Sequence, residues 1–285
     1  MGMRFRRLLP LLFAVALPAQ QPATPPGGAP VPWETISIHV TDPAHADNGF
    51  EHNVANGLSQ HAMTINFFIA AAYTFTIFPT KDLIEGLPDW AKDTKYDVEA
   101  RVAPEDAAAY KKLTSLSIPD TARAFATQQY TGEMLMDQAL LEDRFHIKMH
   151  TELRERNVFL LTVAKGGIKM KAAADPAHGS AIFDAGHTSG RGIGHISGKG
   201  IPVSFIGNIL SMPAGGIVVD QSGDVGQYDF ELHFAPQNMD TAAAGASNDP
   251  DFFTAIQEQL GLKLTRGKAQ VPVVVIDHIE KPSDN

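Results

Sequence analysis

An internal repeat is the feature that most constrains the fold of this chain of 285 residues. Residues 145–149 (FHIKM) align without gaps with residues 260–264 (LGLKL). At the same separation of 115 residues, 158–161 (VFLL) align with 273–276 (VVVI). A repeated apolar pattern of this kind indicates that one supersecondary unit occurs twice.

The repeat extends upstream, where the separation between matching residues grows. Residues 96–99 (YDVE) match 228–231 (YDFE) at a separation of 132, and 63–67 (MTINF) match 201–205 (IPVSF) at 138. The separation therefore decreases along the chain, because the first copy contains additional loop residues. Loops accept such insertions because loop length costs little free energy.

Each copy predicts the order strand, strand, helix, strand, strand, helix, strand, strand. We expect the second helix of each copy over 134–144 and 252–260. The predicted fold is α+β, with two duplicated lobes that are each a mainly antiparallel sheet covered by two helices. The expected repeats are 33–171 and 181–285, and whether they form separate domains or share one continuous sheet stays open.

The N-terminus predicts export. Residues 1–19 have the pattern of a signal peptide, with three arginines before a short apolar run and then small residues. An uncleaved N-terminal anchor is the alternative. Residues 20–32 (QQPATPPGGAPVP) predict a linker rich in Pro and Gly. We expect a periplasmic or secreted protein with no membrane span in the mature chain.

Composition narrows the function classes. The absence of cysteine excludes disulfides, thiol nucleophiles and Cys-ligated metals. A net charge of −9 argues against a nucleic-acid binder, which needs clustered Lys and Arg. The partners that we expect are an envelope protein or an extracellular ligand.

Histidines and acidic residues concentrate between positions 38 and 63, but they lack the spacing of known metal motifs. They are His39, Asp42, His45, Asp47, Glu51, His52 and His61. The sequence predicts no metal site and no cofactor, and it leaves the catalytic residues unknown. Convergence of His39, His45, Asp42 and Glu51 would favour an enzyme, whereas scattering would favour a binding protein.

Other conspicuous residues are interpreted as structural. The repeated Tyr-Asp pair suggests that Asp97 and Asp229 share a capping role in both copies, because a duplicated catalytic acid is a less economical explanation. Trp90 is expected to fold a loop onto the core. The glycine-dense stretch 186–200 predicts a turn and strand, since it fails the phosphate-loop pattern. The charged stretch 152–156 (ELRER) predicts a solvated hairpin turn between two strands.

Several segments resemble a known family. They are 85–90 (EGLPDW), 96–100 (YDVEA), 140–150 (LLEDRFHIKMH), 163–167 (VAKGG), 218–220 (VVD), 226–230 (GQYDF) and, most specifically, 252–285. The chain resembles an uncharacterised family of secreted, soil-associated proteins that is abundant in soil acidobacteria. The resemblance implies export, and it supplies no catalytic residues. In some members of the family, the resembling domain looks to be joined to a membrane-embedded metallopeptidase. This sequence has neither the transmembrane helices nor the H-E-x-x-H motif of such a peptidase, so the resemblance does not imply that activity.

The function expected from the sequence is a non-enzymatic extracytoplasmic binding or accessory module. The alternative is a secreted hydrolase that acts on a cell-envelope or polysaccharide substrate. The two hypotheses differ in one structural respect. A hydrolase predicts polar site residues in one lobe that have no equivalents in the other.

Overall fold

The computed structural model describes residues 24–45, 50–77, 81–184, 194–235 and 249–282. The strands are β1 (Thr35–Val40), β2 (Phe50–Val54), β3 (Gly57–Thr64), β4 (Ile84–Glu85), β5 (Lys95–Arg101), β6 (Lys148–Val163), β7 (Lys171–Ala172), β8 (Ser180–Asp184), β9 (His195–Pro202), β10 (Val218–Asp220), β11 (Gln227–His233) and β12 (Leu262–His278). The helices are α1 (Ile65–Tyr73), α2 (Asp89–Asp93), α3 (Ala107–Thr114), α4 (Ile118–Ala126), α5 (Gly132–Phe145), α6 (Val203–Ala214) and α8 (Phe252–Ala255), which continues into a π-helical turn, η4 (Ile256–Leu260).

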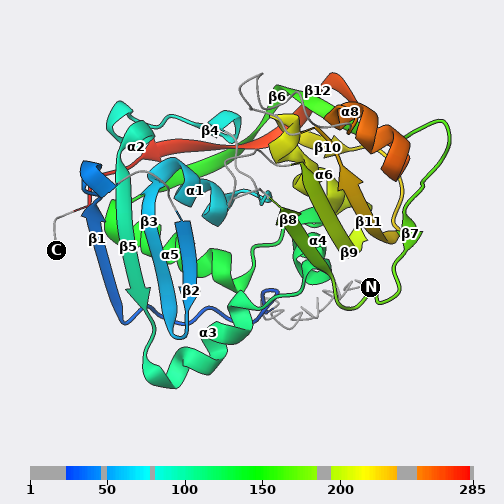
Figure 1. The fold of residues 1–285 in the computed structure, drawn as a ribbon. Coiled ribbons are helices and arrows are strands. Elements are labelled where there is room, and N and C mark those ends of the chain that lie inside the picture. The colour runs from blue at the N-terminus through cyan, green and yellow to red at the C-terminus, as the bar shows by residue number, and fades with distance from the viewer. Residues whose placement is uncertain (1–23, 46–49, 78–80, 185–193, 236–248, 283–285) are drawn as a thin grey trace, which may run out of the picture.

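These elements form two lobes that share a third sheet (Figure 1). The first lobe contains the sheet β1-β5-β3-β2, and the second contains β7-β11-β9-β8. Both sheets are antiparallel throughout their described pairings. The third sheet has the order β10-β6-β12-β4. The predicted α+β class with mainly antiparallel sheets is therefore confirmed.

The shared sheet is built on one long antiparallel ribbon, β6 with β12. At its centre Glu155 lies opposite Gln270, a pair separated by the 115 residues of the repeat. The short strand β4 of the first copy pairs with β12 of the second, and β10 of the second copy pairs with β6 of the first. The equivalent pairs are Ile84 with Val274 and Phe159 with Val218. The two halves of the chain thus exchange strands, an arrangement that the sequence left open.

The hairpin turn predicted at 152–156 is wrong. These five residues lie inside β6 and pair with residues 269–273 of β12. Their charges are accommodated along the ribbon, where Arg156 contacts Glu85 and Lys268 Nζ lies 2.8 Å from Glu155 Oε1. A run of charges resembles a turn in sequence, but partners on neighbouring strands make it compatible with an exposed strand face.

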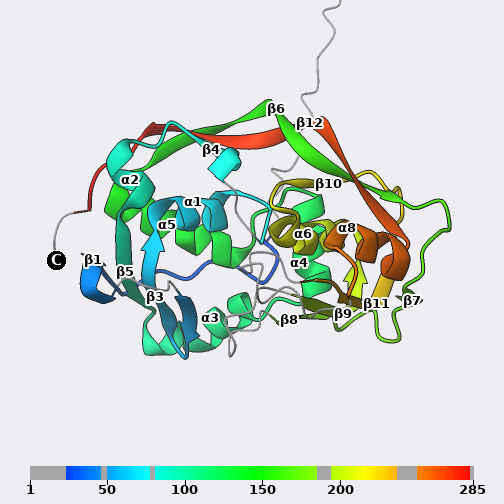
Figure 2. The same cartoon turned by 45° about the horizontal axis from the view of Figure 1, so that its top comes forward.

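Helices α1, α5 and α6 lie between the ribbon and the lobe sheets (Figure 2). Figure 2 shows β6 and β12 crossing both lobes on one side, with α1, α5 and α6 beneath them. Helices α1 and α5 are N-capped by Thr64 and Thr131, whose hydroxyls accept backbone N–H groups. Residues of the exchanged strands also pack in the hydrophobic core of the opposite lobe. Val274 of β12 packs in the first lobe, and Leu161 of β6 packs in the second.

The duplicated Asp97 and Asp229 hold the same bulge in each lobe. In β3 and in β9, one extra residue interrupts the pairing, and it leaves Ala62 with φ 52° and Gly200 with φ 61°. Asp97 Oδ1 accepts the N–H of Ala62 at 2.9 Å, and Asp229 Oδ1 accepts that of Gly200 at 2.8 Å. The geometry agrees with the structural interpretation of the Tyr-Asp pair.

The structure describes part of the predicted N-terminal linker and the position of Trp90. The predicted signal peptide, 1–19, lies outside the described residues. Residues 24–32 lie along the first lobe, where the Gly132 N–H donates to the Pro26 carbonyl at 2.9 Å. Trp90 is half-buried against the first core, and the ammonium of Lys281 lies 5.8 Å from its ring centroid. No helix in the described part of the chain is both long and apolar enough to cross a membrane.

Candidate ligand cleft and histidine cluster

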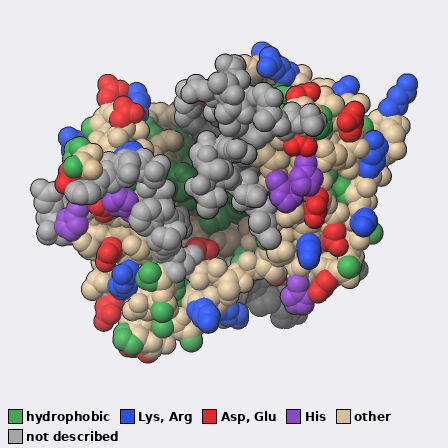
Figure 3. Space-filling view, in the orientation of Figure 1, with side chains coloured by type: hydrophobic (Ala, Val, Ile, Leu, Met, Phe, Trp, Pro, Cys, Tyr) green, Lys and Arg blue, Asp and Glu red, His purple; other side chains and the backbone are tan. Residues whose placement is uncertain are grey.

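A cleft of about 440 Å³ lies where the two lobes meet the ribbon. Its lining comes from both copies of the repeat. The lining residues are Tyr73, Thr74, Phe75, Thr76, Leu83, Gln128, Tyr130, Thr151, Ser204, Asn208, Ser211, Ile217, Val218, Val219, Asp220, Gln270, Val271, Pro272 and Val274. Figure 3 shows a hollow between the lobes with apolar side chains at its floor. The volume is that of a site for a small molecule.

Helix ends and strand ends position the polar part of this lining. Helix α1 ends at Tyr73, and the Thr74 hydroxyl donates to the Ala70 carbonyl at 2.7 Å. Ser204 and Asn208 are one turn apart on α6 and share its half-buried face toward the cleft. Asp220 ends β10, and its Oδ1 accepts the N–H of Ser222. These side chains are held by regular elements rather than by loose loops.

The aromatic wall of the cleft combines apolar faces with neutral hydroxyls. The rings of Phe75 and Tyr130 stack with their centroids 5.2 Å apart. Burial raises the pKa of Tyr73, and the neighbouring Glu142 and Tyr130 raise it further. Burial also raises the pKa of Tyr130. Both phenols therefore stay protonated at neutral pH and can donate hydrogen bonds.

The described lining is almost free of charge. It contains hydroxyl and amide side chains and one carboxylate, Asp220, but no histidine, lysine or arginine. Such a lining suits an uncharged ligand that has an apolar face and several hydrogen-bonding groups, since an ionic ligand would lose hydration without a matching charge.

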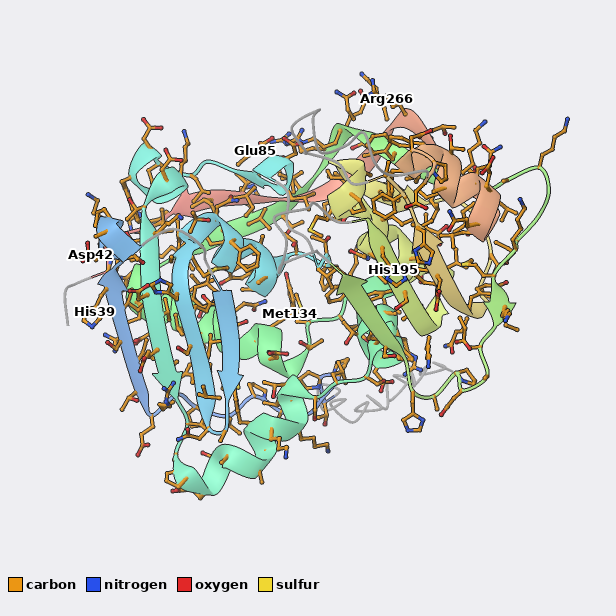
Figure 4. All side chains as sticks on the ribbon, viewed as in Figure 1. His39, Asp42, Glu85, Met134, His195 and Arg266 are labelled. Atoms are coloured by element: carbon orange, nitrogen blue, oxygen red, sulfur yellow. The ribbon has the colours of Figure 1, made fainter. Side chains whose placement is uncertain are left out.

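A second group of polar side chains lies on the sheet of the second lobe. His195 of β9 faces His233 of β11 in the strand register, and Glu231 lies two residues before His233. The two imidazole rings stack with centroids 4.3 Å apart and an angle of 9° between their planes. Glu231 Oε2 lies 3.5 Å from His233 Nε2. We call these three residues the histidine cluster. Figure 4 labels His195 on the second lobe.

Local pairing explains why the cluster forms. The Phe234 N–H donates to the Gly194 carbonyl, so the adjacent pair of His195 and His233 is a non-hydrogen-bonded pair, in which side chains approach most closely. The backbone of His233 is bonded instead to the side-chain amide of Gln259. The His233 N–H donates to Gln259 Oε1 at 2.9 Å, and Gln259 Nε2 donates to the His233 carbonyl at 2.7 Å. Within the described part of the chain, the Nε2 atom of His195 is buried without a hydrogen-bond partner.

The histidines singled out by the sequence whose side chains the structure describes, His39 and His61, do not join this cluster. His39 Nε2 lies 2.8 Å from the Ser37 hydroxyl, Asp42 accepts the Ala44 N–H, and His61 Nδ1 lies 2.9 Å from Asp97 Oδ1. Figure 4 places His39 and Asp42 at the outer edge of the first lobe and His195 on the second lobe. The side chains of His45, Asp47, Glu51 and His52 lie outside the described residues.

The ribbon carries a further charged group around His150. Its Nδ1 lies 2.9 Å from Asp277 Oδ2, and its Nε2 lies 2.8 Å from Glu152 Oε1. Hydrogen bonds to Asp277 and Glu152 raise the pKa of His150. Both ring nitrogens are thus engaged by carboxylates, and the exposed arrangement is an ion pair across neighbouring strands.

Sequence reasoning missed the histidine cluster and the cleft. A weak signal was present, because Glu231 and His233 alternate along a strand and therefore share a face. The position of His195 opposite them depends on the register of β9 with β11, which the sequence does not state. The cleft combines residues from far apart in the chain, so no local pattern marks it.

The comparisons with known proteins give one match. The family model described as "Protein of unknown function (DUF3738)" matches residues 66–279. The chain belongs to this family. The DUF3738 match includes the cleft and the histidine cluster, and it begins after β1, β2 and β3 of the first lobe. Comparison with curated proteins and with solved structures found no match.

Proposed function

We propose that this DUF3738 chain is an exported, non-enzymatic binding module that holds a small uncharged ligand between its lobes. The observation that carries this proposal is the cleft of about 440 Å³, to which both lobes and the ribbon contribute. Export, to the periplasm or the medium, is supported by the pattern of residues 1–19 and by the resemblance to secreted, soil-associated proteins.

The lining defines the chemistry of the ligand. The stacked rings of Phe75 and Tyr130 offer an apolar face, while Ser204, Asn208 and Gln270 offer hydroxyl and amide groups. A saccharide unit with an amide substituent has matching features, since its ring has an apolar face and its edge has hydroxyls. Envelope saccharides are the ligand class that we propose.

Binding can be tested with soluble oligomers of N-acetylglucosamine in native mass spectrometry and calorimetric titration. We expect one oligomer per chain. The variant Asn208→Trp fills the cleft from α6 and should lower the affinity by about tenfold or more, because a ligand cannot share the volume. The matched control is Met212→Trp, on the same helix at a position that does not line the cleft.

The outcome decides between clear alternatives. Saturable binding that Asn208→Trp weakens and Met212→Trp leaves unchanged supports the proposal. The absence of binding, or equal binding by both variants, contradicts the saccharide assignment. A bound small molecule of another class that co-purifies with the chain and is lost in Asn208→Trp would keep the cleft as the site and change the ligand.

The second candidate function is a secreted hydrolase of envelope polymers. The observation that favours it is the histidine cluster, which occupies one lobe only. The test is turnover of insoluble peptidoglycan by the purified chain. Turnover that Glu231→Gln abolishes would replace the binding module as the function, whereas turnover that survives this change would place any catalysis elsewhere.

A further inference from the structure

We propose that the histidine cluster of His195, Glu231 and His233 binds a divalent transition-metal ion. Two imidazoles and one carboxylate are a donor set that suits Zn²⁺ and its neighbours in the periodic table, whereas Ca²⁺ and Mg²⁺ prefer oxygen ligands alone. The site goes beyond the proposed saccharide cleft, because none of its three residues lines that cleft.

The donor atoms are already close to the positions that a metal requires. One ligand atom from each residue lies within 4.8 Å of the other two. In a tetrahedral zinc site with bonds of about 2.0–2.1 Å, neighbouring ligand atoms are about 3.4 Å apart. To complete the site, side-chain rotations must move each donor by about 1 Å and turn the two imidazoles, now within 9° of parallel, until their nitrogen lone pairs converge on one point. Within the described residues, no other three His, Asp or Glu donors lie this close together.

An independent observation points to a ligand at His195. Its Nε2 atom is buried and has no hydrogen-bond partner among the residues that the structure describes. Buried polar atoms are nearly always paired, because an unpaired one loses its hydration without compensation. A lone pair directed to a metal ion would compensate this nitrogen.

The backbone beneath the cluster is fixed. His195 and Glu231 with His233 stand on two paired strands, and Gln259 bonds both backbone groups of His233. Ligands on paired strands lose less conformational entropy on binding than ligands on loops. Three protein ligands also leave one tetrahedral position open for water or another molecule.

The test is calorimetric titration of ZnCl₂ into the full chain after treatment with a chelator. We expect one ion per chain, and we expect His233→Ala to lower the affinity by at least about a hundredfold, since outer-shell changes alone cost 10- to 100-fold. The matched control is His39→Ala on the first lobe, which should bind Zn²⁺ as the unmodified chain does. Equal binding by the unmodified chain and His233→Ala, or no stoichiometric binding at all, would overturn the proposal.

A second variant and a second probe separate lost ligation from lost structure. Glu231→Gln keeps the size of an exposed side chain and should also weaken Zn²⁺ binding, while circular dichroism and the unfolding midpoint in chelator stay unchanged. Co²⁺ should give the visible absorption of a tetrahedral complex in the unmodified chain and in His39→Ala. A normal tetrahedral spectrum in folded Glu231→Gln and His233→Ala would contradict this site.

Discussion

One end of each lobe sheet has the same backbone pairing but different side chains. In the first lobe this end is formed by β3 and β5, and in the second by β9 and β11. Gly57 faces Arg101 in the first lobe, and His195 faces His233 at the corresponding register in the second. In each lobe a glutamate lies two residues before one member of this pair, Glu99 before Arg101 and Glu231 before His233. The first lobe pairs this glutamate with an arginine, at 3.4 Å, which cannot ligate a metal.

This difference shows which features serve the fold and which are free to serve function. The bulge held by Asp97 and Asp229 occurs in both lobes, so the sheet requires it. The pair of histidines occurs in one lobe, so the sheet does not require it. A feature that the repeat leaves unmatched is therefore a better candidate for function than a feature that it preserves.

The largest effect expected from a comparison of the two lobes comes from truncating equivalent core residues. Leu141 and Ile256 are separated by 115 residues and are both fully buried, in the first and the second core. We expect Leu141→Ala and Ile256→Ala each to lower the free energy of unfolding by about 2–5 kcal/mol, because each leaves a cavity. Urea unfolding measures both.

The same experiment tests whether the lobes unfold together. The chain has two tryptophans, and Trp33 and Trp90 both pack on the first core. Because Val274 and Leu161 are exchanged between the cores, Ile256→Ala should shift the tryptophan fluorescence transition and the circular dichroism transition equally. A fluorescence transition that Ile256→Ala leaves in place would show that the lobes unfold independently.

The two lobes can also be compared by small substitutions at the corresponding positions Gly57 and His195. A methyl group on Gly57 would overlap the carbonyl of Ala100, so Gly57→Ala should lower the free energy of unfolding by about 1–3 kcal/mol. His195→Ala at the corresponding position should change it by no more than about 0.5 kcal/mol in chelator. Denaturant midpoints of the two variants check this. Equal destabilisation would mean that the fold requires the His195 side chain, which would contradict its freedom to serve function.

The repeat explains how much of the fold the sequence could predict. Apolar spacing predicts helices over 134–144 and 252–260, close to the observed 132–145 of α5 and 252–260 of α8 with η4, because burial of one face is a local pattern. The exchange of strands is a tertiary property, and the charged residues 152–156 concealed it. They form an exposed strand only because β12 and Glu85 lie beside them.

The candidate sites were less predictable than the fold. Interpreting Asp97 and Asp229 as structural required only that they recur. Finding the histidine cluster required the register that places His195 beside His233, and finding the cleft required the contact between lobes. Both depend on long-range pairing, which leaves no fixed spacing in the sequence.

The smallest expected effect is the acid dependence of the Asp97 bulge. Partial burial opposes ionisation of this carboxyl, but the Ala62 N–H, the Thr41 hydroxyl and His61 outweigh it and hold the pKa of Asp97 below its ordinary value. A lowered folded-state pKa stabilises the fold above the unfolded value of about 3.9, and this contribution is lost as pH falls through the folded value. Asp97→Asn should therefore lose less stability than the unmodified chain between pH 5 and pH 3, on the order of a few tenths of a kcal/mol after solvent screening. Urea midpoints across this range measure it, with the exposed Glu105→Gln as a control that keeps the original slope. Parallel curves for Asp97→Asn and the unmodified chain would show that the bulge in the first lobe is held by hydrogen bonds that do not depend on the charge of the carboxylate.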